Sequence, residues 1–139
     1  MSFTKRRVLI TTKTHADGDV SGPTAGCCGG IDIQNSEWVR LSPIPLADLD
    51  VTHLRKYTIV EVPCRKHPSD SRPGSLEVDW SAMKSVRWVH SMKKWRQRGE
   101  AILPTASTSL CEMMREGRSL GLFKPVDVQF SYAAVDEDA

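Results

Sequence analysis

The chain has 139 residues, of which 26% are charged and 40% apolar, and a formal net charge of +2. This length fits one domain that buries roughly two-thirds of its extended surface and needs neither a disulfide nor a metal to fold. No apolar run approaches the roughly 20 residues of a membrane span, and the start lacks a secretion signal. We expect a single cytoplasmic domain over residues 1–139, with frayed ends at 1–5 and 134–139, no membrane contact and reduced thiols.

The first third of the chain reads as three strands. Residues 7–14 are rich in β-branched side chains and predict a strand that is partly buried on both faces. A polar loop at 15–23 follows; its acids could ligate a cation, but a solvated turn is the simpler interpretation. Three glycines within 24–33 predict a bulged or tightly packed strand where another backbone or a ligand comes close. Residues 28–41 then read as a hairpin.

The returning strand of this hairpin carries an aromatic ring and a cation on one face. Because side chains alternate along a strand, Trp38 and Arg40 point one way, while Val39 and Leu41 point the other. The prolines at 43 and 45 are expected to end the strand. The exposed face predicts either a recognition platform or a core strand with a half-exposed tryptophan.

A short helical crossing is expected at 46–54 and a clear strand at 57–62. The loop at 63–73 holds three prolines, which restrict its backbone, together with three cations and one acid. Such a rigid polar loop is often functional. The alternative is a structural turn that an Asp70–Arg72 pair closes.

The second half mixes strands and helices. A short strand is expected at 76–80. Residues 82–98 predict a helix with a basic stripe and an apolar arc that places Trp88 beside Trp95. Alternatively, Ser91 caps a shorter helix from Met92 that follows an extended segment at 86–89. A second helix is expected at 109–116, and clean alternation predicts a final strand at 126–132.

These elements predict an α+β fold: a small OB-like or partly open antiparallel β-barrel of five or six strands, with one or two helices inserted before the last strand. The expected core consists of Val8, Ile10, Val39, Leu41, Ile59, Val60, Val128 and Phe130.

Two motifs resemble a family of small uncharacterised bacterial and phage proteins. One is Thr24-Ala25-Gly26 followed by Trp38-Val39-Arg40-Leu41-Ser42-Pro43-Ile44-Pro45, and the other is His67-Pro68-Ser69-Asp70-Ser71-Arg72-Pro73. The group is also similar to dual OB-domain proteins of bacterial conflict systems. The resemblance implies a barrel-like nucleic-acid module from phage, plasmid or defence loci, and it implies no reaction. The chain departs from the group's motif at Gly74, where the group has an acid.

Metal binding and catalysis are weighed against simpler interpretations. Cys64 and His67 have the spacing of zinc ligands, and Cys27 with Cys28 could complete a site. Adjacent cysteines rarely both bind one zinc, so buried metal-free thiols are expected. No pattern singles out a nucleophile with its base, so no catalytic residue and no cofactor are predicted.

Nucleic-acid binding is the favoured function, because such barrels combine aromatic faces with cations that follow the backbone. The ligand is DNA or RNA, and the protein is expected to act as a subunit of a larger conflict, defence or mobile-element complex. The candidate binding residues are Trp38, Arg40, Arg65, Lys66, Arg72, Lys84, Arg87, Lys94 and Arg98. Trp88 and Trp95 are expected in the core.

Two alternatives stay open. Four tryptophans in 139 residues also suit a protein-interaction subunit, an adaptor or inhibitor that does not touch nucleic acid. A nucleic-acid-processing enzyme is the second alternative.

Overall fold

The structure is a computed structural model that describes residues 2–13, 26–44 and 54–135. The loop expected at 15–23 and the crossing expected at 46–54, apart from its last residue, lie outside the described residues. The elements in chain order are β1 (Thr4–Lys13), β2 (Gly26–Asp32), β3 (Glu37–Ile44), β4 (Thr58–Lys66), β5 (Ser75–Val78), η2 (Trp80–Ala82), β6 (Lys84–Trp88), α1 (Met92–Ile102), η3 (Leu103–Thr105), β7 (Ala106–Ser107), α2 (Leu110–Arg115) and β8 (Leu122–Phe123).

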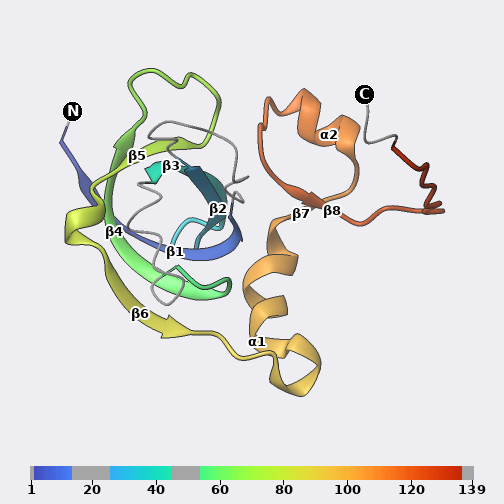
Figure 1. The fold of residues 1–139 in the computed structure, drawn as a ribbon, viewed down its shortest axis with the longest axis horizontal. Coiled ribbons are helices and arrows are strands. Elements are labelled where there is room, and N and C mark those ends of the chain that lie inside the picture. Colours follow the sequence, from blue (N-terminus) through green and yellow to red (C-terminus); the bar gives the residue numbers. More distant parts are fainter. Residues whose placement is uncertain (1, 14–25, 45–53, 136–139) are drawn as a thin grey trace.

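Five strands close into a barrel (Figure 1). Their order is β1-β2-β3-β5-β4, and β4 pairs back onto β1. All neighbours are antiparallel except β3 and β5, which run parallel. A small five-stranded Greek-key barrel is the architecture of the OB-fold. The expected α+β fold with an OB-like barrel is therefore confirmed.

The barrel interior is apolar and follows the alternation of the sequence. The six barrel residues of the expected core are buried: Val8, Ile10, Val39, Leu41 and Val60 in the main apolar cluster, and Ile59 in a second cluster with Leu9. The thiols of Cys28 and Cys64 also lie inside. Burial raises the pKa of Cys28 to about 12 and that of Cys64 to about 11, so both thiols are protonated.

The glycine-rich strand β2 packs against β1 as closely as its composition predicted. A Cβ on Gly30 would lie 2.3 Å from the Leu9 carbonyl oxygen and 2.8 Å from Val8 Cγ1. At Gly30 the close neighbour is therefore the backbone of β1 and not a ligand.

Asp32 at the end of β2 is fully buried and organises the following turn. It pairs with Arg6 at 3.0 Å and accepts hydrogen bonds from the backbone N–H groups of Gln34 and Asn35. Sequence reasoning did not identify this acid, which has a structural role.

The ends of two strands differ from expectation. β3 does not stop before Pro43: it continues to Ile44, which pairs with Gly26. β1 already begins at Thr4, opposite Cys64, so the frayed end expected over 1–5 is shorter.

The single helix expected over 82–98 is wrong, and its alternative, an extended segment before a helix from Met92, is correct except for the cap. Residues 84–88 form β6, which pairs antiparallel with β4, and α1 begins at Met92. Ser91 precedes α1 but makes no side-chain capping bond. Left-handed φ angles at Lys93, Lys94 and Trp95 produce a kink in the first turn. The basic stripe of one long helix therefore does not exist.

The final strand expected at 126–132 is also wrong. These residues form no strand, and Val128 and Phe130 are 51% and 93% exposed, so neither belongs to the core. The last strand is the two-residue β8, which pairs with β7. The expected helix at 109–116 is confirmed as α2, whose Ser109 cap accepts a hydrogen bond from the Glu112 N–H.

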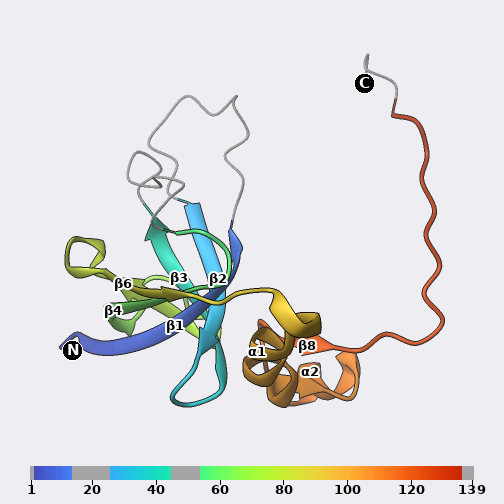
Figure 2. The ribbon, with the colours of Figure 1, turned by 90° about the horizontal axis from the view of Figure 1, so that it is seen from below.

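The C-terminal third packs beside the barrel (Figures 1 and 2). α1 contributes Ala101 and Ile102 to a second apolar cluster with Leu9, Ile59 and Val89. Beyond β8 the chain runs away from the rest of the molecule (Figure 2). Within the described ranges, neither α-helix has the length and apolar character needed to cross a bilayer.

Candidate nucleic-acid interface

The outer face of β3 presents the side chains that the alternation predicted. Trp38, Arg40 and Ser42 are partly exposed, while Val39 and Leu41 are buried. The face adjoins β5 and the β4–β5 loop, since β3 pairs with β5 in parallel. In OB-folds the face of strands 2 and 3, with the loops between strands 1 and 2 and between strands 4 and 5, binds oligonucleotides.

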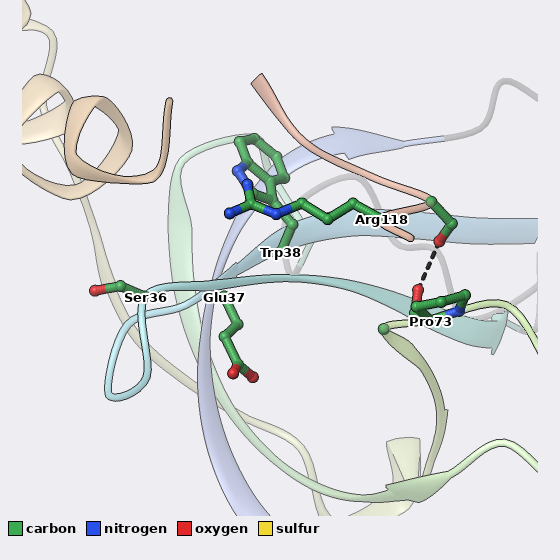
Figure 3. Close-up of a pocket in the computed structure, with 7 residues that line it drawn as sticks. Ser36, Glu37, Trp38, Pro73 and Arg118 are labelled. Carbon is green, nitrogen blue, oxygen red and sulfur yellow. Dashed lines mark hydrogen bonds between the residues drawn. The ribbon is translucent and has the colours of Figure 1, made fainter. Parts of the chain in front are cut away.

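Trp38 is held in place by the C-terminal third. Its indole Nε1 donates to Thr105 Oγ1 at 2.9 Å. The ring lines a pocket of about 340 Å³ together with Arg118, Ser119 and the end of the β4–β5 loop (Figure 3). The hydrogen bond therefore fixes the edge of the ring, and the partly exposed ring lines the hollow.

Arg40 lies in a separate groove of about 550 Å³ between β2, β3 and the β4–β5 loop. Its Nη1 donates to Ser75 Oγ at 3.0 Å and to Ser119 Oγ at 3.4 Å. In the described part of the chain, Arg40 contacts no carboxylate. The groove residues are Gly26, Cys27, Arg40, Ser42, Pro43, His67, Pro68, Ser69, Arg72 and Glu77.

Ser119 marks the boundary between the two hollows. Its hydroxyl donates to the Pro73 carbonyl oxygen at 2.5 Å, the contact dashed in Figure 3, and accepts from Arg40. Sequence reasoning missed Ser119 and Ser75, because an isolated serine carries no pattern that predicts a contact.

The β4–β5 loop is ordered by its own side chains. His67 Nδ1 accepts the backbone N–H groups of Ser69 and Asp70 at 3.2 and 3.0 Å. Asp70 accepts from Arg72 Nε and Nη2 at 2.9 and 2.7 Å, and from Ser75 Oγ at 2.9 Å. The Asp70–Arg72 pair expected of a structural turn is present, yet the Arg72 side chain remains 59% exposed at the groove.

Gly74 closes the loop onto β3. Its φ of +80° is strained for any other residue, and a Cβ here would lie 2.8 Å from the Trp38 carbonyl oxygen. Its own carbonyl accepts the Arg40 N–H at 2.8 Å. In this chain the position therefore requires glycine.

We expect the loop to loosen at acid pH. Hydrogen bonds from the Arg72 side chain, above all, hold the pKa of Asp70 far below its ordinary value. The stabilisation is complete above the ordinary pKa of about 4 and decreases as the pH falls below it, toward the folded-state pKa. The NMR shift of the Arg72 amide, which donates to Asp70, should follow this change. Asp70→Asn should give the Arg72 amide, at neutral pH, the shift that wild type has at acid pH. An Arg72 amide shift that neither acid pH nor this substitution alters would contradict the expectation.

A family model described as a domain of unknown function, DUF8758, matches residues 4–104. The chain belongs to the DUF8758 family. Comparisons with curated proteins and with solved structures gave no match. The DUF8758 match contains the barrel, the β4–β5 loop and α1, whereas Arg118 and Ser119 lie beyond it.

The remaining predicted cations of this DUF8758 protein are not gathered on one surface. Arg65 pairs with Glu77 and lies 4.6 Å from the Phe3 ring centroid, while Lys66 is exposed at the end of β4. Exposed Lys84 and Arg87 belong to β6, and Lys94 lies in the left-handed turn of α1. Arg98 is only 5% exposed and cannot serve as a phosphate contact.

Arg98 instead lies at the centre of an aromatic cluster. Its Cζ is 3.7 Å from the ring centroid of Tyr57, 4.8 Å from that of Trp95 and 5.4 Å from that of Trp88. Its Nε donates to the Val89 carbonyl oxygen at 3.0 Å. The expectation that Trp88 and Trp95 lie in the core is wrong for Trp95, which is 49% exposed, and Trp88 is half-buried.

Cys64 and His67, which have the spacing of zinc ligands, make other contacts in the structure. The Cys64 thiol lies in the barrel interior and donates to the Val62 carbonyl oxygen. The His67 Nδ1 atom accepts loop N–H groups. Over residues 2–13, 26–44 and 54–135, no three His, Cys, Asp or Glu side chains converge to hold a metal. Cys111, unlike the buried thiols expected, is exposed.

Proposed function

We propose that this DUF8758 protein binds single-stranded nucleic acid, without cleaving it, in the groove between β2, β3 and the β4–β5 loop. The observation that carries the proposal is the environment of Arg40. Its guanidinium lies in an open groove, where two serine hydroxyls orient it and no carboxylate of the described chain contacts it; Glu77, which also lines the groove, pairs with Arg65. A cation held in this way is suited to a phosphate oxygen.

Two further features support this function. The groove occupies the part of an OB-like barrel where OB-folds bind oligonucleotides. Arg72 adds an exposed cation on the loop, and Trp38 presents a ring in the neighbouring hollow, where a base can stack. We further propose that the ligand is DNA or RNA and that the protein acts in the cytoplasm as a subunit of a larger conflict, defence or mobile-element complex.

We expect Arg40→Ala to weaken binding at least about tenfold, since a hydrogen bond to a charged group contributes about 1.5–3 kcal/mol. The measurement is fluorescence anisotropy with labelled oligothymidine and oligouridine of about 12 nucleotides, within the site size of an OB-fold. Wild-type affinity should fall steeply as salt is raised, because phosphate contacts release counterions.

Arg96→Ala is the matched control. Arg96 is an exposed arginine on α1, outside the groove, and pairs with Glu100 at 3.2 Å. Equal losses in both variants would show that the groove is not the site. If the wild type binds neither oligonucleotide at low salt, the nucleic-acid function fails and a protein-interaction subunit takes its place.

A further inference from the structure

The segment after β8 carries apolar side chains that its own chain leaves exposed. Phe130 is 93% exposed and Tyr132 is fully exposed, and both belong to the alternating run 126–132. Soluble proteins rarely expose large apolar groups in a contiguous row unless a partner covers them. The alternation is that of a strand with one apolar face, although the segment forms no strand in this structure.

β6 offers an edge for such a strand. It ends the sheet order β1-β2-β3-β5-β4-β6, so in the described part of the chain only β4 pairs with it. A sheet edge presents unpaired N–H and C=O groups to which an extended segment can add as a further strand. Val86 on β6 is 43% exposed, and Trp88 is half-buried.

Charge makes this edge and this segment complementary. Residues 84–98 contain six cations and no acid, and Lys84 and Arg87 lie on β6 itself. Residues 126–132 contain one acid, Asp127, and no cation. A basic strand edge with apolar positions therefore has, in the same sequence, an apolar strand-like segment that carries one acid and no cation.

We propose that residues 126–132 of one copy pair with β6 of a second copy, and that reciprocal exchange forms a two-fold dimer. The segment leaves β8 on the side of the molecule away from β6 (Figures 1 and 2), which favours a second copy over the chain's own edge. In a two-fold dimer each copy donates one segment and receives one, so both apolar rows and both edges are covered. This proposal is independent of nucleic-acid binding.

The test is sedimentation velocity of the full chain, with hydrogen exchange of the β6 amides. Wild type should sediment at twice the monomer mass of 15.5 kDa, with slow exchange along β6. Two double variants, Phe130→Ser with Tyr132→Ser and Lys84→Glu with Arg87→Glu, should each raise the dimer dissociation constant at least about tenfold. Because the four replaced side chains are exposed, the barrel should stay folded, and circular dichroism checks this.

The control is Lys93→Glu with Arg96→Glu, which removes two cations of the same basic segment outside β6. It should leave the dimer intact. If this control weakened the dimer as much as the β6 variant does, general charge attraction and not strand pairing would hold the dimer together, and the proposal would be overturned. A monomeric wild type would also overturn it. If the Phe130/Tyr132 variant of that monomer exchanged its β6 amides faster than wild type, the strand on β6 would be the chain's own segment.

Discussion

Gly30→Ala is expected to destabilise the barrel by about 3 kcal/mol or more. The added methyl group would lie 2.3 Å from the Leu9 carbonyl oxygen, a distance that no Cβ tolerates, and 2.8 Å from Val8 Cγ1. Both contacts belong to β1, the neighbouring strand. β1 also pairs with β4 on its other edge, so it cannot move outward without disturbing the closure of the barrel.

The matched control is Gly99→Ala in α1. A Cβ there would lie 3.6 Å from Leu103 Cδ1, an ordinary contact, and alanine favours a helix over glycine by about 0.5–1 kcal/mol. Urea unfolding should therefore show a large loss for Gly30→Ala and a small gain for Gly99→Ala. Equal effects at the two positions would contradict the close approach of β1 and β2.

The glycine run shows why much of the barrel could be predicted. Three glycines in a strand predict that another backbone or a ligand lies close, and Gly30 lies against the backbone of Leu9. The alternation of Val39 and Leu41 with Trp38 and Arg40 gave the inner and outer faces of β3. In both cases the side chains of the segment itself determine how it packs.

The wrong secondary-structure predictions concern segments whose structure depends on neighbouring elements and not on their own side chains. Residues 84–88 form a strand because β4 offers an edge, and four of them are exposed, so their own pattern did not decide between a helix and an extended segment. The helical arc that placed Trp88 beside Trp95 was fortuitous; the two rings meet through Arg98. Residues 126–132 have the alternation of a strand, but alternation does not say which edge the strand would join.

The candidate site was predictable only in part. Sequence alone indicated the Trp38–Arg40 face and the rigid loop with its Asp70–Arg72 pair. It did not indicate that Ser119, from a segment 79 residues away, contacts Arg40 and separates two hollows. Such contacts depend on the path of the chain after the barrel, which no local pattern specifies.

Arg98→Ala is expected to lower the free energy of unfolding by about 3 kcal/mol. A guanidinium packed against aromatic faces away from water contributes up to about 2 kcal/mol, and its loss leaves the Val89 carbonyl oxygen without this donor, at a cost of about 1–3 kcal/mol. Its removal also opens a space beside the rings of Tyr57 and Trp95, whose centroids lie 5.3 Å apart in an edge-to-face contact.

Arg98→Lys separates stacking from charge. Lysine keeps the cation but not the planar fork, so we expect it to recover less than half of the loss. Arg96→Ala, two residues away and exposed, should change stability by no more than about 0.5 kcal/mol. Urea unfolding with tryptophan fluorescence measures all three variants, since Trp88 and Trp95 report directly on the cluster. If Arg98→Ala were as mild as Arg96→Ala, the aromatic cluster would not be what fixes α1 to the barrel, and the apolar contacts of Ala101 and Ile102 would have to account for it.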